Sequence, residues 1–204
     1  MILSIHPDNP DVRKIRQVVD ILNGGGIIIY PTDTVYSFGC SLKNKKAIEK
    51  LARLKDVKMK KANFSIVFCD LSQLADYTKH VDRPTYKILN KNLPGPYTFI
   101  LEASPQIPKL FDSNRKSIGI RIPNNNIAIE LVKALGHPLV TSSVHDEDEI
   151  LEYTSDPQEI AGKWKTNVDV IIDGGSGSKI ASTVVDLSEG EILLIRQGAG
   201  ELLL

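Results

Sequence analysis

The chain has 204 residues, of which 42% are hydrophobic and 25% are charged, and its 25 Lys and Arg balance its 25 Asp and Glu. This composition is typical of a globular domain with a sizeable core, and it excludes disordered, collagen-like and coiled-coil proteins. The zero net charge argues against a protein that coats nucleic acid non-specifically, because such binding needs excess Lys and Arg, although a local basic patch remains open.

The first residues, Met1-Ile-Leu-Ser-Ile-His-Pro-Asp, contain no apolar stretch long enough for a signal peptide, and no segment approaches the length of a membrane span. We therefore expect a cytoplasmic protein with no membrane partner. Cys40 and Cys69 each end an apolar run, which favours buried free thiols over a disulfide. No repeat or linker interrupts the pattern, so we expect residues 1–204 to form a single domain.

The first predicted element is a buried strand at residues 27–31, which follows a turn of three glycines. Asn44 can cap a helix that continues to about residue 54, because the apolar residues there recur at helical spacing. The next strand is predicted at residues 64–69.

Asp82 is predicted to cap a helix over residues 83–91, with a proline in its first turn, and residues 97–102 are again strand-like. Apolar and polar residues alternate over 117–122, which predicts another strand. A helix over 126–135 ends at a glycine that suits a left-handed cap.

The last predicted elements are a strand at 139–143, a helix at 157–164, and strands at 168–172, 183–187 and 191–196. Strands that alternate with helices indicate an α/β fold, and the neighbouring strands at the C-terminal end indicate some antiparallel pairing.

Two familiar site motifs fail on spacing. Residues 169–179 resemble a phosphate loop, but Ser178 separates Gly177 from Lys179, whereas that loop needs Gly-Lys-Ser/Thr in succession. The four histidines show no metal-ligand spacing, so we predict no protein metal site. The acidic run Asp146-Glu-Asp-Glu is expected to be a solvated loop and is a weak candidate for binding magnesium.

Four segments, in order, carry a family resemblance: Tyr30-Pro-Thr-Asp-Thr-Val-Tyr-Ser-Phe-Gly-Cys, Leu93-Pro-Gly-Pro-Tyr-Thr-Phe-Ile-Leu, Ser117-Ile-Gly-Ile-Arg-Ile-Pro, and Ser182-Thr-Val-Val-Asp-Leu with the later Leu194-Ile-Arg-Gln-Gly-Ala-Gly. Together they resemble the YrdC/YciO-like threonylcarbamoyl-AMP synthase family. The sequences His6-Pro-Asp-Asn-Pro and Asn63-Phe-Ser are similar to the YciO branch of that family.

The resemblance implies an α/β fold with a YrdC-like twisted mixed parallel/antiparallel sheet, flanking helices and a concave, largely positive cleft. It also implies that L-threonine, bicarbonate and ATP are converted to threonylcarbamoyl-AMP and pyrophosphate, for the threonylcarbamoyladenosine modification of tRNA. Mg²⁺ is expected to accompany ATP as substrate.

Site residues follow from matching positions in the family motifs. The planar fork of Arg121 suits the threonine carboxylate, and Thr34 and Ser182 match hydroxyl positions of the amino-acid pocket. The matched positions on the nucleotide side are Lys55 and Arg196, which face the phosphates, and Asn63, Ser117 and Ser142. The resemblance gives no residue a catalytic role.

The sequence also departs from the family pattern, in positions that we expect to fall in the cleft. Val57 stands where an arginine is usual, and Val144 replaces the asparagine of a Ser-Ala-Asn signature. Ser37 and Phe38 replace Gly-Leu. Lys58 or Lys60 is a candidate to supply the missing charge.

Two functions therefore stay open. The first is a threonylcarbamoyl-AMP synthase-like enzyme with slow turnover. The alternative is a paralogue that binds a nucleotide or double-stranded RNA without efficient turnover, for which the basic residues 53–61 are the main support. A solvated helix end explains those basic residues equally well.

Overall fold

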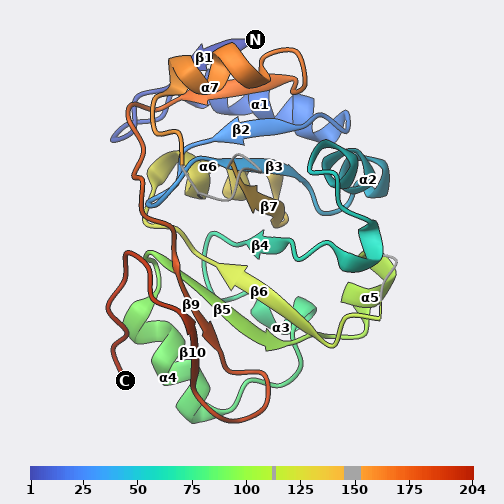
Figure 1. The fold of residues 1–204 in the computed structure, drawn as a ribbon, viewed down its shortest axis with the longest axis vertical. Helices are drawn as coiled ribbons and strands as arrows, with labels where there is room; N and C mark the ends of the chain where they lie inside the picture. The colour runs from blue at the N-terminus through green and yellow to red at the C-terminus, as the bar shows by residue number, and fades with distance from the viewer. Residues whose placement is uncertain (112–113, 145–152) are drawn as a thin grey trace.

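The computed structural model of the protein describes residues 1–111, 114–144 and 153–204. Within these residues ten strands form one sheet in the order β1-β8-β2-β3-β7-β4-β6-β5-β9-β10 (Figure 1). In chain order the strands are β1 (Ile2–Ser4), β2 (Ile28–Tyr30), β3 (Ser37–Ser41), β4 (Ser65–Val67), β5 (Tyr97–Glu102), β6 (Ser117–Arg121), β7 (Leu139–Ser143), β8 (Val170–Asp173), β9 (Thr183–Asp186) and β10 (Leu193–Arg196).

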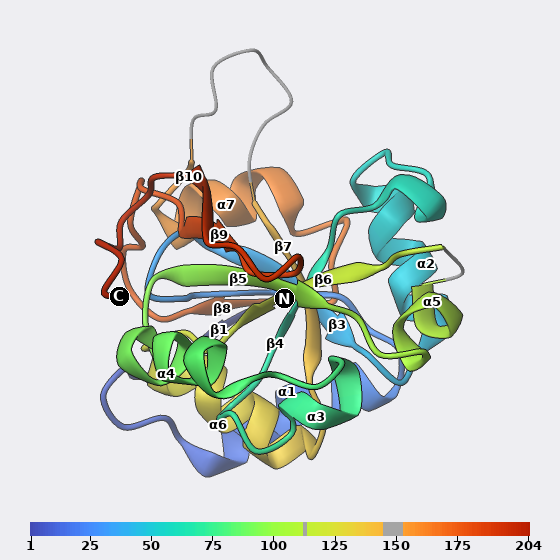
Figure 2. The same ribbon diagram turned by 90° about the horizontal axis from the view of Figure 1, so that it is seen from below.

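Parallel and antiparallel pairs are mixed in this sheet. Strands β1 and β2 both pair parallel to β8, as do β4 with β6 and β5 with β9, whereas the other neighbours are antiparallel. The view from below shows that strands from different parts of the sheet cross at an angle, so the sheet is twisted (Figure 2). The predicted fold class is therefore confirmed.

The described helices flank the sheet, and those of eight or more residues each begin at a side chain that caps them. They are α1 (Val12–Asn23), α2 (Lys45–Leu54), α3 (Leu74–Tyr77), α4 (Arg83–Asn92), α5 (Gln106–Phe111), α6 (Asn126–Leu135) and α7 (Pro157–Trp164), with a short 3-10 turn, η1 (Met59–Lys61). Asn44 accepts the Ala47 N–H at 3.1 Å, and Asp82 accepts the Thr85 N–H at 2.9 Å. These bonds satisfy backbone donors that the helix itself leaves unpaired.

The packing of β2 on both faces of the sheet explains why its sequence is a continuous apolar run. Ile28 and Tyr30 pack with α1 and α6 on one face of the sheet, while Ile27 and Ile29 belong to the core on the other face. Because successive strand residues point to opposite faces, a strand covered on both faces needs apolar residues at every position.

Most predicted elements are present with ends shifted by a few residues, and Gly136 adopts the expected left-handed cap with φ 74°. The sequence interpretation missed β1, α1 and the short helices α3 and α5. It also predicted no strand at the position of β3. Cys40 is buried as expected, but Cys69 is only half-buried, and both thiols are free.

Candidate functional site

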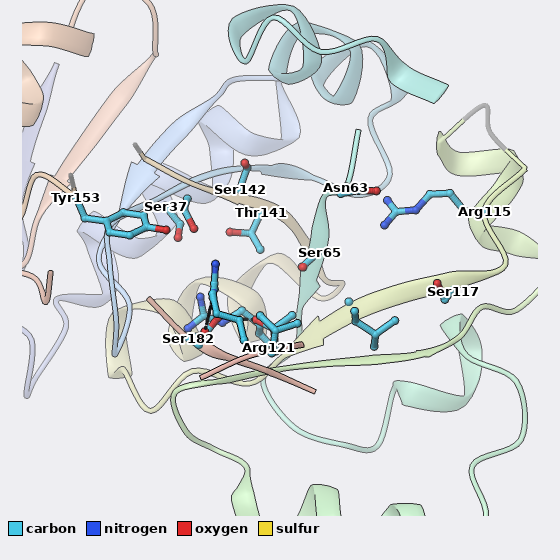
Figure 3. A pocket seen from close by; sticks show the side chains of 16 residues that line it. Ser37, Asn63, Ser65, Arg115, Ser117, Arg121, Thr141, Ser142, Tyr153 and Ser182 are labelled. Atoms are coloured by element: carbon cyan, nitrogen blue, oxygen red, sulfur yellow. Dashed lines mark hydrogen bonds between the residues drawn. The ribbon is translucent and has the colours of Figure 1, made fainter. Parts of the chain in front are cut away.

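A cavity of about 490 Å³ lies over the middle of the sheet and is rich in hydroxyl groups (Figure 3). Its described lining consists of Ser37, Asn63, Ser65, Thr98, Ile100, Arg115, Ser117, Gly119, Arg121, Thr141, Ser142, Ser143, Tyr153, Ser182, Val184 and Arg196. Hydroxyls and guanidinium groups are suited to phosphate and carboxylate oxygens, since both donate hydrogen bonds. The cavity is therefore a candidate site for an anionic ligand.

Strand register brings the floor of this cavity together. Thr141 of β7 pairs with Ser65 of β4, Ser65 pairs with Gly119 of β6, and Gly119 pairs with Ile100 of β5. Paired residues point to the same face of a sheet, so these four residues form a row across four strands.

Two residues further along β4 and β7, helices cover the same face of the sheet. Val67 and Leu139, which pair with each other, pack into the core beneath α1 and α6. The neighbouring pair on that face, Ser65 and Thr141, lines the cavity instead. The cavity thus begins where the helix cover of the sheet ends.

Gly119 keeps the floor of the cavity open. A Cβ atom at this position would lie 2.5 Å from Ser65 Oγ and 3.2 Å from Thr98 Cγ2. Such distances are shorter than side chains tolerate without moving. The glycine therefore leaves room that any larger residue would fill.

Arg121 is the most buried charged group of the site, with only 5% of the residue exposed. Its Nη2 donates to Asp33 Oδ1 and to Thr34 Oγ1, each at 2.9 Å. Its Nε is buried and has no hydrogen-bond partner among the described residues. Asp33 also accepts the Asn124 N–H at 2.9 Å, so one of its carboxylate oxygens binds Arg121 and the other binds the Asn124 backbone.

Ser182 and Arg196 lie at the same end of the cavity. Arg196 donates to the Ser182 carbonyl from Nη2 at 2.8 Å and from Nε at 3.2 Å. The Ser182 hydroxyl shares a hydrogen bond of 2.8 Å with the hydroxyl of Thr98. Arg121 and Arg196 therefore provide two positive charges at this end, and Asp33 balances one of them.

Tyr30 lies on the same face of the sheet as Thr141 and fixes its hydroxyl. Its phenol donates to Thr141 Oγ1 at 3.0 Å, and that hydroxyl donates to the Phe38 carbonyl at 3.1 Å. Burial raises the pKa of Tyr30 to about 12, so the phenol keeps its proton at neutral pH. With its proton committed, the Thr141 hydroxyl can only accept a hydrogen bond from a ligand.

Asn63, Ser117 and Arg115 form the opposite end of the cavity (Figure 3). Arg115 donates from Nη1 to the carbonyls of Ala62 at 3.1 Å and Phe64 at 3.0 Å, and its guanidinium lies 5.2 Å from the centre of the Phe111 ring. Burial lowers the pKa of Arg115, although a guanidinium stays charged in any case.

Six of the eight matched residues line this cavity: Asn63, Ser117, Arg121, Ser142, Ser182 and Arg196. Thr34 does not line it, because it lies fully buried behind Arg121, whose guanidinium it supports. Lys55 is not among the lining residues either. It ends α2, is mostly buried, and its Nζ lies 5.6 Å from the centre of the Phe38 ring. Lys55 therefore does not line this cavity among the described residues, and its role toward the phosphates stays a prediction.

The departures from the family pattern are also placed differently from our expectation. Val57 is 37% exposed and lines a separate groove with Lys58, and Val144 is 3% exposed and packs in the core. Phe38 is fully buried in that core as well. Of the four changes, Ser37 alone lines the cavity. The acidic run 146–149 and His145 lie outside the described residues.

Sequence reasoning missed Ser65 of β4, Thr98 of β5 and Thr141 and Ser143 of β7, and it missed Arg115. The missed hydroxyls had a usable signal, because Ser65, Thr98 and Thr141 each alternate with buried apolar neighbours in short strands. Asp33 stands inside the quoted motif but was given no role. Arg115 had no local signal, since it precedes its strand in an ordinary polar stretch.

In the part of the chain that the structure describes, no group of three or more His, Cys, Asp or Glu side chains is placed to hold a metal ion. No described helix is long and apolar enough to cross a membrane.

Comparison with protein families gives one match over most of the chain. The Sua5/YciO/YrdC family model, described as "Telomere recombination", matches residues 20–198. An uncharacterised protein from Haemophilus influenzae is 41% identical over 197 residues, which cover 96% of this chain and 94% of that protein. A threonylcarbamoyl-AMP synthase from Nitrosococcus oceani is 28% identical over 166 residues, which cover 81% of this chain and 88% of the synthase.

Two solved structures share the fold. The crystal structure of YciO from E. coli superposes with a TM-score of 0.89 at 38% identity, covering 98% of this chain and 97% of that one. The structure of Sua5 from P. abyssi in complex with L-threonine has a TM-score of 0.88 at 23% identity, covering 97% of this chain and 57% of that one. At 23% identity, the likeness to Sua5 shows a shared fold and no more than that.

Proposed function

The chain belongs to the Sua5/YciO/YrdC family, and on this premise we propose that it is an L-threonylcarbamoyladenylate synthase-like enzyme with slow turnover. Its substrates are L-threonine, bicarbonate and ATP, and its products are threonylcarbamoyl-AMP and pyrophosphate. The adenylate then serves the threonylcarbamoyladenosine modification of tRNA. Support comes from the synthase relative and from the structural neighbour that binds L-threonine.

The observation that carries this proposal is the buried Arg121 at one end of the cavity. Its Nη2 is fixed by Asp33 and Thr34, while its buried Nε has no partner in the described chain. An unpaired buried donor costs about 1–3 kcal/mol, and a carboxylate accepting from Nε removes that cost. Arg121, Arg196 and Asp33 together leave one net positive charge, which one carboxylate neutralises.

The rest of the cavity suits the two chemical steps. The threonine amine attacks the carbon of bicarbonate, and loss of water gives a carbamate. A carbamate oxygen then forms a bond to the α-phosphorus of ATP while the bond from that phosphorus to the pyrophosphate oxygen breaks. These steps ask mainly for positioning and for donors to developing negative charge. Ser182, Ser142 and Ser117 are hydroxyl donors spaced along the cavity.

Mg²⁺ enters this proposal with ATP and not as a resident metal. None of the described residues that line the cavity is Asp or Glu, and Asp33 is engaged by Arg121 and Asn124. Magnesium often keeps several waters and binds mainly through substrate phosphates, so this donor set is compatible with a substrate-borne ion. When bound, the ion neutralises phosphate charge.

The proposal of slow turnover rests on residues 55–58, which follow α2 and do not line the cavity. Lys55, Val57 and Lys58 are not among the cavity residues, so the described part of this segment brings no cation to the phosphates. A missing charged hydrogen bond that strengthens in the transition state is worth roughly 1.5–3 kcal/mol, which lowers a rate by about ten- to a hundredfold.

Pyrophosphate release tests the proposal directly. The purified protein should release pyrophosphate from ATP only when L-threonine and bicarbonate are both present, and mass spectrometry should detect threonylcarbamoyl-AMP. Omitting either co-substrate is the control, and Arg121→Lys should lower the signal. If the protein binds ATP but full and incomplete mixtures release pyrophosphate equally, the synthase assignment is wrong.

A second candidate function, binding of a nucleotide or double-stranded RNA without turnover, is favoured by one observation. Arg53 and Lys58 line a groove outside the cavity, next to the exposed Lys60 and Lys61. Glu49 and Asp56 line the same groove and reduce its positive charge. If this groove binds RNA, replacing Lys58, Lys60 and Lys61 with Gln should abolish salt-dependent retention of an RNA duplex, while cavity variants such as Arg121→Lys leave it unchanged.

A further inference from the structure

The cavity carries positive charge at two separated ends. Arg121 and Ser182 lie at one end, where Arg196 donates to the Ser182 carbonyl, and Arg115 lies at the other end, beside Asn63 and Ser117 (Figure 3). Ser117 and Arg121 are four residues apart on β6, which corresponds to about 13 Å at a rise of roughly 3.3 Å per residue. A ligand that uses both ends must therefore be elongated and must carry negative charge at two places.

Arg115 is held in a defined orientation by contacts that use only part of its guanidinium. Nη1 donates to the carbonyls of Ala62 and Phe64, and the ring of Phe111 lies against the group. The guanidinium points into the cavity (Figure 3). Because two carbonyls fix a single nitrogen, Nε and Nη2 form the edge that a ligand can use.

The charge of Arg115 is not neutralised by any carboxylate in the described residues. The ion pairs found there involve Lys50, Lys79, Arg121 and Lys133, and none involves Arg115. Carbonyl groups accept its hydrogen bonds but bring no negative charge. A partly buried guanidinium without a counter-ion among those residues favours binding of an anion, since the protein screens its charge less than water does.

The chemistry of the proposed reaction selects which anion lies at this end. In a displacement at phosphorus, the attacking oxygen and the leaving oxygen lie roughly in line on opposite sides of the atom. If the threonine carboxylate lies at Arg121, the carbamate attacks from that end. The leaving pyrophosphate must then point along the cavity away from Arg121, toward Arg115.

We infer that Arg115 binds the pyrophosphate portion of ATP and receives the pyrophosphate leaving group. In the step concerned, the bond between the α-phosphorus and the carbamate oxygen forms as the bond to the pyrophosphate oxygen breaks, and the electron pair departs with pyrophosphate. This inference rests on the proposed function for the direction of attack. The segment that ends α2 contributes no lining residue to the cavity, so Arg115 takes the place of a cation from that segment.

Equilibrium binding of inorganic pyrophosphate, ATP and AMP, each with Mg²⁺, tests the inference. Arg115→Met should weaken binding of pyrophosphate and ATP by about 10- to 100-fold and leave AMP binding nearly unchanged. Arg115→Lys should be intermediate, because lysine keeps the charge but lacks the fork. Arg83→Met, an exposed arginine on α4, is the matched control and should bind all three ligands like the wild type.

Arg115→Met also loses two bonds to carbonyls, so a test on the unaltered protein is needed. Phenylglyoxal modifies arginines, and mass spectrometry of peptides reports on each one. Pyrophosphate and ATP should protect Arg115 from modification, whereas AMP should not.

Three results would overturn the inference: no affinity of the wild type for pyrophosphate, equal loss of AMP and ATP binding in Arg115→Met, or no protection of Arg115. Failure of the proposed function looks different. In that case pyrophosphate binding still depends on Arg115, but threonine and bicarbonate cause no release of pyrophosphate from ATP.

Discussion

At the residue scale, Arg121 combines a structural bond with an unused donor. The Asp33 carboxylate neutralises its charge, and both side chains are almost fully buried. A buried ion pair contributes little net stability, but losing one partner leaves an uncompensated charge in a medium of low polarity. The pair therefore holds the guanidinium in place beside the cavity, while its Nε has no partner among the described residues.

Arg121→Lys should weaken L-threonine binding by about 10- to 100-fold, because a lysine ammonium cannot reproduce the two-pronged contact with a carboxylate. Folding should change much less, since the ammonium keeps its charge beside Asp33. Titration calorimetry measures the affinity, and Arg53→Lys on the exposed face of α2 is the control. Unchanged affinity for threonine would remove Arg121 from the amino-acid pocket.

Asp33→Asn should lower the free energy of unfolding by about 3 kcal/mol, because it strands the buried charge of Arg121. Glu130→Gln breaks the exposed pair with Lys133 and should cost less than about 1 kcal/mol. Urea denaturation of both variants gives the comparison. Equal losses in the two variants would show that Asp33 does not compensate Arg121.

At the element scale, the turn between α6 and β7 is tied to the end of β3. Ser41 Oγ lies 2.7 Å from His137 Nε2, and both residues are buried. Burial, and secondly the positive charge of Lys43, lowers the pKa of His137 from its usual 6.5. The folded protein therefore holds this imidazole neutral under conditions in which the unfolded chain would protonate it.

The stability contributed by neutral His137 should be fully present above pH 6.5 and should fall as the pH decreases from there toward the lower pKa of the folded state, because the unfolded chain then binds more protons. Urea denaturation between pH 8 and pH 5 measures this loss. In His137→Gln, which keeps a hydrogen-bonding side chain but does not titrate, the loss should be smaller. Parallel curves for the two proteins would contradict this assignment.

At the scale of the whole molecule, the cavity draws residues from strands on both sides of the β7–β4 pair. Ser37 comes from β3, Arg121 from β6, and Ser182 lies next to β9. A ligand that spans these strands binds the native sheet and has no equivalent site in the unfolded chain. Its binding should therefore stabilise the fold as a whole.

ATP with Mg²⁺ at about a hundred times its dissociation constant should add about 2.7 kcal/mol to the free energy of unfolding. For a chain of this length, that corresponds to a rise in melting temperature on the order of 5–10 °C. Differential scanning calorimetry measures the shift, and adenosine at the same concentration is the control. A melting temperature that does not respond to saturating ATP would exclude the cavity as a nucleotide site.

Helices and strands whose signals come from near neighbours could be predicted from the sequence. A cap such as Asn44 or Asp82 bonds to a residue three positions along, and the alternation in residues 117–122 belongs to one strand. The ordered motifs likewise indicated the family and the fold, and six matched residues do meet in one cavity. These features could be predicted because their signals do not depend on which strands pair.

Which side chains line the cavity depends on the pairing and packing of distant parts of the chain. The row of Thr141, Ser65 and Gly119 exists because β7, β4 and β6 pair in one register, although these residues are far apart in the chain. Lys55 matches a motif position and Val144 departs from one, yet both pack against the core and neither lines the cavity. A strand's pairing partners and its free face depend on contacts made across the whole chain, and no local pattern encodes them.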